Sequence, residues 1–525
     1  MNRTRTRYSG IICHPTSFPG PHGIGDCGDD AYRFVEWMQR AAQTHWQVLP
    51  LAPVGSGDSP YASPSAFAGS PLLISLPWLV GDGLLDPSSI ADPPPFSASQ
   101  VEFDAVRAFK MPLFREAFHR FQAGASSHLR PEFDVYLEAQ RDWLDDFALF
   151  MALKQEFDGA AWIDWPPPIA LRDSGALAEA RGRLRNEIRL QQFTQFLFDR
   201  QWADLHRYAN QHGLRIVGDL PIFVAYDSAD VWAHRDLFRL DREGRPLLVA
   251  GVPPDAFSAT GQFWGNPVYD WDRHQATGLQ WWIDRIRTTL QRVDMLRIDH
   301  FRGFAASWVI PFGATVAAEG RWEEGPGREF FATLVRELGE LPLIVEDLGL
   351  ITSDVVALRQ ALNLPGMSVL HFAFDSGSSN AYLPHNYTPL TVCYTGTHDN
   401  QTTVGWFRSL PDHLRTNVQR YLGRDGSDIA WDLIRLAHES VADWAIVPLQ
   451  DVMRLDDDAR MNAPGSGSGN WGWRYTPHLL HDGLSAGLRE LTETYGRTGS
   501  VYRHGGHDPY DYTVATTEHG LHRRI

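Results

Sequence analysis

Eight short apolar runs recur along the chain, and stretches with helical spacing separate most of them. The runs have the length of strands and begin near residues 8, 46, 214, 295, 343, 368, 391 and 444. Short apolar strands that alternate with helices are typical of α/β proteins with a parallel sheet. Eight such units predict a (β/α)₈ TIM barrel, in which active sites lie at the carboxyl ends of the strands.

Two long stretches interrupt this alternation. Residues 71–180 contain helical blocks at 101–121 and 132–157, and we expect a mostly helical insertion there. Residues 222–275 are rich in turn-forming residues and are expected to form a loop-rich insertion. The chain then divides into barrel segments 1–70, 181–221 and 276–497, the two insertions, and a C-terminal tail, 498–525, with loose packing expected from Gly496 onward.

Composition and charge limit the classes of partner and the cellular compartments that we expect for this protein. The chain has 525 residues, of which 43% are hydrophobic and 21% are charged, as in an ordinary globular protein. Its net charge of -17 disfavours nucleic acid and anionic membranes as partners. Three widely separated cysteines form no disulfide framework, and the N-terminus lacks the apolar segment of a signal peptide. We therefore expect a cytoplasmic protein.

Acidic residues follow five of the eight apolar runs. They are Asp219, Asp299, Glu346, Asp399 and Asp451. Aspartate is common in loops, so one such residue has little weight. Five at one rim of a barrel indicate a functional site, because the carboxyl ends of all the strands face the same way.

The run that ends at Asp299 has the clearest local chemistry. Side chains alternate along a strand, so Leu296 and Ile298 share one face while Arg297 and Asp299 share the other. A neighbouring guanidinium favours the charged form of a carboxylate, and a charged, partly dry carboxylate is suited to nucleophilic attack. The alternative is a structural ion pair at the end of a strand.

Converging carboxylates are compatible with two chemistries. A divalent cation needs several oxygen ligands, but the positive charge of Arg297 argues against a cation beside Asp299. A retaining glycosidase needs one ionised nucleophile and one protonated acid about 5–5.5 Å away. Asp299 suits the first role, while Glu346 and Asp347 are both candidates for the second, and their spacing does not decide between them.

Aromatic residues are frequent, with 19 Trp and a total aromatic content of 12%. Most aromatic side chains pack in cores, but aromatic faces are also the surfaces on which sugar rings stack. A carbohydrate substrate therefore agrees with the composition.

Six groups of residues resemble the motifs of one enzyme family. They are Gly57–Tyr61, Gly218–Pro221, Pro254–Ser258 with Gly261–Pro267, Arg297–Gly303, Glu346–Gly349 and Thr397–Asn400. In combination they are similar to the 4-α-glucanotransferases, also called amylomaltases or disproportionating enzymes, of the α-amylase clan. The resemblance extends from about Tyr8 to Arg497. It implies a retaining enzyme that moves segments of α-1,4-glucan to the 4-hydroxyl group of an acceptor.

The same resemblance implies a role for each of three carboxylates. Asp299 is the nucleophile that forms a covalent β-glucosyl-enzyme, and Glu346 is the general acid/base. Asp399 grips sugar hydroxyl groups and stabilises the oxocarbenium-like transition state. The implied substrate-binding residues are Arg297, His398, Asp219, Tyr61, Ser59, Trp264, Asp255, Gln262, His300 and Asn470.

The resemblance also implies the partners. It points to maltooligosaccharides, amylose or glycogen-derived glucans, with no metal and no organic cofactor, and we expect a monomer or a weak homodimer. Trp264 and the insertion 222–275 would cover the acceptor side, because transfer requires that water be kept out while the acceptor is held close. A plain α-glucan hydrolase and a non-catalytic glucan-binding barrel remain alternatives.

Overall fold

The eight predicted strands close into a barrel. The computed structural model describes residues 5–254 and 260–499. The barrel strands are all parallel and follow the order β1-β12-β11-β10-β9-β6-β3-β2. Their bounds are β1 (Tyr8–Ile12), β2 (His45–Gln47), β3 (Arg215–Pro221), β6 (Met295–Asp299), β9 (Leu343–Val345), β10 (Gly366–Val369), β11 (Thr391–Tyr394) and β12 (Trp444–Pro448). The predicted fold class is confirmed.

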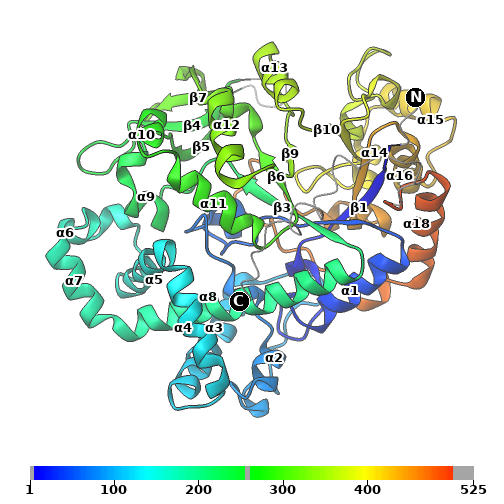
Figure 1. The fold of residues 1–525 in the computed structure, drawn as a ribbon. Helices are drawn as coiled ribbons and strands as arrows, with labels where there is room; N and C mark the ends of the chain where they lie inside the picture. Colours follow the sequence, from blue (N-terminus) through cyan, green and yellow to red (C-terminus); the bar gives the residue numbers. More distant parts are fainter. Residues whose placement is uncertain (1–4, 255–259, 500–525) are drawn as a thin grey trace.

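Amphipathic helices surround the barrel, as Figure 1 shows. In α1 (Asp29–Arg40), Phe34 and Met38 lie one turn apart and are fully buried, which places the apolar stripe of this helix against the strands. The other long barrel helices are α8 (Arg185–Gln211), α11 (Gln280–Leu290), α12 (Gly327–Leu338), α13 (Ser353–Ala361), α15 (Asp412–Leu422), α16 (Ile429–Glu439) and α18 (Asp482–Thr494).

The first insertion is helical and hangs below the barrel at the lower left of Figure 1. Its longer helices are α3 (Phe103–Gln122), α4 (Arg130–Ala139), α5 (Arg141–Glu156) and α7 (Ser174–Arg183). The helical block expected at 132–157 consists of two helices, because the helix breaks at Gln140 into α4 and α5. Helical periodicity continues across the break, so the pattern of apolar residues does not reveal it.

An antiparallel sheet stands beside the carboxyl end of β6, and the sequence patterns did not predict it. Its strands follow the order β5-β4-β7-β8. Two of them come from the insertion expected as loop-rich, namely β4 (Leu248–Val252) and β5 (Gln262–Pro267). The other two follow Asp299 in the chain, namely β7 (Ala306–Pro311) and β8 (Arg321–Glu324). The sheet therefore pairs the chain segment before β6 with the segment after β6.

Two local expectations need correction. A strand was expected at 368–374, but the chain leaves the sheet at Val369 and enters a 3₁₀ turn, Leu370–Phe372. Leu370 is fully buried in that turn, so burial alone does not distinguish it from a strand residue. Loose packing from Gly496 onward is also wrong, because Arg497 is fully buried and its guanidinium donates to the carbonyl oxygens of His438 (2.7 Å) and Ser440 (2.9 Å). Residues 500–525 lie outside the described part of the chain.

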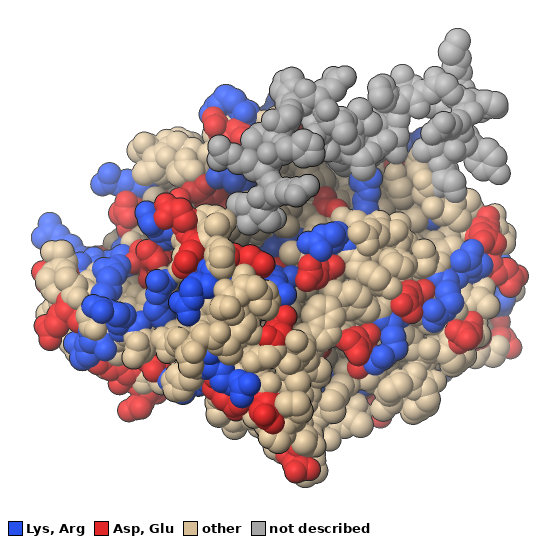
Figure 2. Space-filling view, turned by 60° about the horizontal axis from the view of Figure 1, so that its bottom comes forward, with Lys and Arg blue, Asp and Glu red and all other residues tan. Residues whose placement is uncertain are grey.

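The surface carries mixed charge. On the face shown in Figure 2, acidic and basic side chains are interspersed over the part that is described. Every helix within residues 5–254 and 260–499 is too short or too polar to cross a bilayer.

Candidate active site

Three of the predicted carboxylates meet at the carboxyl ends of the barrel strands. Asp299 ends β6, Glu346 directly follows β9, and Asp399 lies in the loop after β11. All three line one cleft of about 940 Å³. The barrel brings them together although 100 residues separate Asp299 from Asp399 in the chain, because neighbouring parallel strands end at the same rim.

Arg297 is the centre of the charge arrangement. Its side chain is buried, and it contacts Asp219 at 2.7 Å, Asp299 at 3.0 Å and Glu346 at 3.3 Å. Burial opposes the charge of this guanidinium, but the neighbouring carboxylates outweigh burial and raise the pKa of Arg297 well above its ordinary value. The predicted alternation along β6 is thus observed: Arg297 and Asp299 face the interior of the barrel mouth together.

The surroundings of Glu346 favour its protonated form. Burial and the nearby charge of Asp299 raise the pKa of Glu346 to about 8, although Arg297 and the backbone N–H of His300, at 2.6 Å, favour the charged form. Asp347 points elsewhere: its carboxylate pairs with Arg359 at 3.0 Å and accepts the N–H of Met367 at 2.8 Å. Of the two candidates left open by the sequence, Glu346 is the one that faces the cleft and Asp299.

Asp399 is held by a pair of residues that the sequence patterns missed. The side-chain amide of Asn462 donates to Asp399 Oδ1 at 2.6 Å, and Arg460 donates to the Asp399 carbonyl oxygen at 2.8 Å. His398 Nε2 lies 3.4 Å from the same Oδ1. Asn462 and Arg460 lie beyond Asp451, well after the end of β12, and their place at the site depends on contacts with Asp399 across 63 and 61 residues of sequence.

The Tyr61 hydroxyl group links Asp219 on β3 with His398 in the loop after β11. It donates to Asp219 Oδ2 at 2.7 Å and lies 2.9 Å from His398 Nε2. The rings of Tyr61 and His398 are stacked, with centroids 5.3 Å apart and an angle of 11° between planes. The indole of Trp471, another residue that the sequence patterns missed, lies 5.5 Å from the Tyr61 ring. Tyr61, His398 and Trp471 all line the 940 Å³ cleft.

Trp264 covers the cleft from β5. Its side chain is 36% exposed, so it is not a core tryptophan that pins the loop. Its Nε1–H donates to Gln262 Oε1 at 3.1 Å, and its ring lies edge-on to His300 with centroids 4.7 Å apart. His300 has a left-handed backbone conformation with φ of 51°, which turns the chain sharply after Asp299.

The remaining residues that the sequence analysis named have different surroundings and different partners. Ser59 lines the cleft and accepts the N–H of Tyr61 at 3.2 Å. Asn470 closes its own loop by accepting the N–H of Ala463 at 2.9 Å. Asp451 is buried, and its carboxylate accepts bonds from Thr395 and Thr403, so this strand-end acid holds loops in place. Asp255 lies outside the described residues.

The cleft has a second arm of about 570 Å³. The two arms meet at five shared residues, which are Gln262, Trp264, His300, Glu346 and Asp399. The two arms therefore adjoin at Glu346 and Asp399.

Known proteins have the same sequence pattern and architecture. A family model described as 4-alpha-glucanotransferase matches residues 13–480. A 4-alpha-glucanotransferase from Synechocystis sp. is 51% identical over 495 residues, which cover 94% of this chain and 98% of the relative. One from Thermus thermophilus is 47% identical, with 94% and 99% covered. The solved amylomaltase from Streptococcus agalactiae in complex with acarbose has a TM-score of 0.91 at 38% identity, with 94% and 100% covered. The chain therefore belongs to the 4-alpha-glucanotransferase family.

Proposed function

We propose that this protein transfers segments of α-1,4-glucan to the 4-hydroxyl group of an acceptor glucan or glucose by double displacement, with Asp299 as the nucleophile and Glu346 as the acid/base. The observation that carries the proposal is the geometry of two carboxyl groups around one buried guanidinium. Arg297 lies 3.0 Å from Asp299 and 3.3 Å from Glu346, so a fixed positive charge stands beside the proposed nucleophile. Burial and the charge of Asp299 keep a proton on Glu346, whose pKa is about 8. Retaining enzymes need this division of roles over a short separation.

In the first step, an Asp299 oxygen attacks C1 of the sugar at the cleavage site. The glycosidic bond between C1 and O4 breaks, and the proton of Glu346 passes to O4 of the departing glucan. The bond between C1 and Asp299 forms with inversion. Asp399, fixed by Asn462 at 2.6 Å, is suited to bind the hydroxyl groups of the same sugar while positive charge develops on it.

In the second step, the ionised Glu346 takes the proton of an acceptor hydroxyl group. The acceptor oxygen attacks C1, and the carboxylate of Asp299 departs, so the original anomeric configuration returns. Water competes for the same intermediate, and transfer wins when the acceptor is held in place and water is displaced. Trp264 and Gln262 form a hydrogen bond with each other and line both arms where these meet. They are therefore suited to shield the intermediate from water.

The charge arrangement favours acid/base chemistry over a cation site. The Arg297 guanidinium lies within 3.3 Å of Asp219, Asp299 and Glu346 and occupies the position from which a cation would have to bind all three. A positive ion beside a buried guanidinium would be strongly repelled. We therefore propose that the reaction needs no metal.

Donor and acceptor are proposed to be maltooligosaccharides, amylose or glycogen-derived glucans. The buried free thiols of Cys13, Cys27 and Cys393 support the proposal that the protein works in a reducing cytoplasm. A monomer or weak homodimer is proposed as its oligomeric state.

Incubation with maltotriose tests the proposal. Transfer yields glucose together with a series of longer maltodextrins, and the number of reducing ends stays constant. A steady rise in reducing ends without longer products would instead show a hydrolase. If neither product pattern appears, the protein is a glucan-binding barrel without this activity.

A further inference from the structure

The second arm of the cleft has an aromatic platform that the proposed mechanism does not use. Trp322, on β8 of the antiparallel sheet, is 37% exposed and lines the 570 Å³ arm, whereas the 940 Å³ arm does not include it. The exposed indole therefore lies beyond the shared catalytic centre.

The guanidinium group of Arg302 packs against the Trp322 indole. The Arg302 guanidinium carbon lies 3.8 Å from the centre of the Trp322 ring. Arg302 is itself buried and donates to the carbonyl oxygen of Leu350 and to Thr352 Oγ1, both at 2.9 Å. The rings of Trp308 and Trp322 form a T-shaped pair, with centroids 5.3 Å apart and an angle of 70° between their planes. A ring held in this way loses little freedom when a ligand stacks on it, which favours binding.

The position of Glu346 identifies which part of the substrate this arm holds. Asp299 lines only the larger arm, so the sugar that is bonded to the nucleophile begins there. Leu348, Gly349 and Leu350, which follow the acid/base directly, line only the smaller arm. Because Glu346 exchanges its proton with the leaving and attacking oxygens, the smaller arm lies on the leaving-group and acceptor side.

The rest of the smaller arm suits a neutral sugar. It offers side chains that donate and accept hydrogen bonds, which are Asp375, Ser376, Asn380, Tyr382 and Asn400. A polar rim around a partly exposed indole matches a pyranose ring, which has C–H groups on its faces and hydroxyl groups around its edge.

Resting on the proposed function, we propose that Trp322 stacks on the second sugar ring of the acceptor and so sets the preference for acceptors longer than glucose. Glucose fills only the position next to Glu346 and does not reach this platform. Maltose and longer acceptors place a further ring in the smaller arm. Arg302 is a positioning residue that holds the platform.

The test uses α-maltotriosyl fluoride as donor, because fluoride leaves without occupying the acceptor arm. Transfer to glucose and to maltose is measured for the wild type, Trp322→Ala, Trp322→Phe and Phe312→Ala. Phe312 is the matched control, since it is 57% exposed directly after β7 of the same sheet but lines neither arm.

We expect Trp322→Ala to raise the KM for maltose as acceptor by about tenfold, the size of one aromatic stack, and to leave the KM for glucose within about twofold. Trp322→Phe should recover most of the maltose affinity, and Phe312→Ala should match the wild type. If Trp322→Ala weakened the use of glucose and maltose equally, Trp322 would have only a structural role and the proposal would be overturned. An unchanged preference of Trp322→Ala for maltose over glucose would overturn it as well. Absence of transfer in the wild type would instead refute the proposed function.

Discussion

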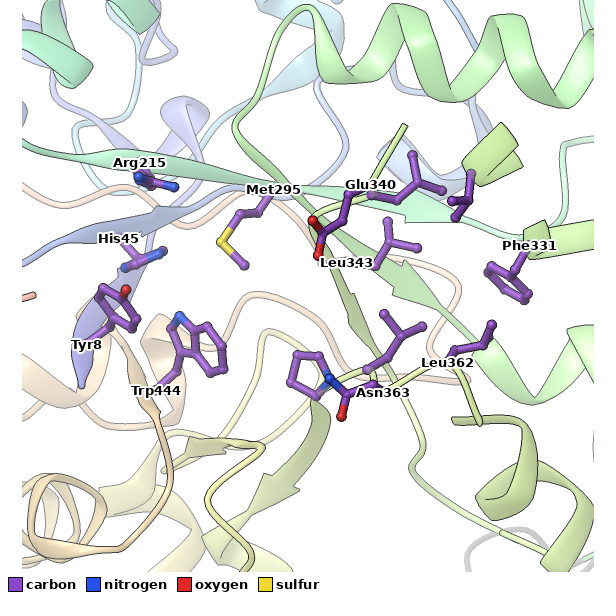
Figure 3. A pocket seen from close by; sticks show the side chains of 14 residues that line it. Tyr8, His45, Arg215, Met295, Phe331, Glu340, Leu343, Leu362, Asn363 and Trp444 are labelled. Carbon is purple, nitrogen blue, oxygen red and sulfur yellow. The ribbon is translucent and has the colours of Figure 1, made fainter. Parts of the chain in front are cut away.

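The two ends of the barrel differ sharply in chemistry, although the same strands build both. At the carboxyl end, Asp299 and Glu346 surround Arg297 at the bottom of an open cleft. At the amino end, a cavity of about 220 Å³ lies among mostly apolar and aromatic side chains, including Met295 (Figure 3). Burial lowers the pKa of His45 there to about 3, so this histidine is neutral.

Strand β6 makes the comparison direct, because it begins with Met295 and ends with Asp299. One end of this strand contributes a buried side chain, and the other end presents the proposed nucleophile. The difference indicates that the amino end contributes mainly stability and the carboxyl end mainly activity. Changes at the two ends should therefore separate these two properties.

The largest effect is expected from Asp299→Asn. The amide cannot form the glucosyl-enzyme, so transfer from maltotriose should fall by about 10⁴-fold or more. The free energy of unfolding should stay the same or rise, because the change removes one negative charge from a crowded cluster. Retained remodelling of maltotriose, checked by chromatography of the products, would refute the role of Asp299.

Glu346→Gln should lower kcat for maltotriose by about 10²–10⁴-fold, the usual contribution of a general acid. Asp347→Asn is its neighbour in sequence and serves as the control. Because Asp347 bonds Arg359 and Met367 away from the cleft, its loss should reduce stability more than kcat. A larger loss of kcat in Asp347→Asn than in Glu346→Gln would reverse the assignment of the acid.

The pH dependence of the first step should show the raised pKa of Glu346. The first step needs the protonated form, so the rate of glucosyl-enzyme formation should be full below pH 8 and fall as the pH rises through about 8. Single-turnover rates at a series of pH values measure this limb. A decline that is already complete at pH 6 would show that Glu346 has an ordinary pKa.

Met295→Ala tests the amino end. Met295 is 6% exposed, and its truncation should lower the free energy of unfolding by about 2–5 kcal/mol through lost packing. Denaturant unfolding measures this change, and kcat of the folded enzyme should remain within about twofold of the wild type. A loss of kcat comparable to that of Asp299→Asn would contradict the separation of the two ends.

The smallest effect is expected from Glu340→Gln at the rim of the same cavity. Its carboxylate is exposed, and substitutions at exposed positions change stability by about 0.5 kcal/mol or less. Activity should be unchanged. An effect on kcat would show that the amino-end cavity communicates with the cleft.

Periodicity predicted the parts of the molecule in which local pattern and packing agree. The barrel strands were predicted because they coincide with short apolar runs that the fold buries on both faces, except β2, His45–Gln47, which was located by the apolar run that begins at Trp46. The alternation of Arg297 and Asp299 followed from strand geometry alone. The acidic rim was predicted correctly in outline, and the geometry brings Asp299, Glu346 and Asp399 to one cleft.

Other features depend on contacts between distant segments. The antiparallel sheet pairs β4 with β7, which lie on either side of β6 in the chain, and β8 ends in exposed charge rather than in an apolar run. Glu346 and Asp347 differ in role because one faces Arg297 and the other Arg359, which their spacing does not encode. Asn462 reaches Asp399 only once β11 and β12 lie side by side.

The most direct test of the central claim is to trap the glucosyl-enzyme in Glu346→Gln supplied with α-maltosyl fluoride. Fluoride leaves without an acid, so the first step proceeds, whereas the second step lacks its base and the intermediate accumulates. Peptide mapping by mass spectrometry should find the maltosyl group on Asp299. A label on Asp399 or Asp219, or a product of inverted configuration with no labelled peptide, would contradict the account.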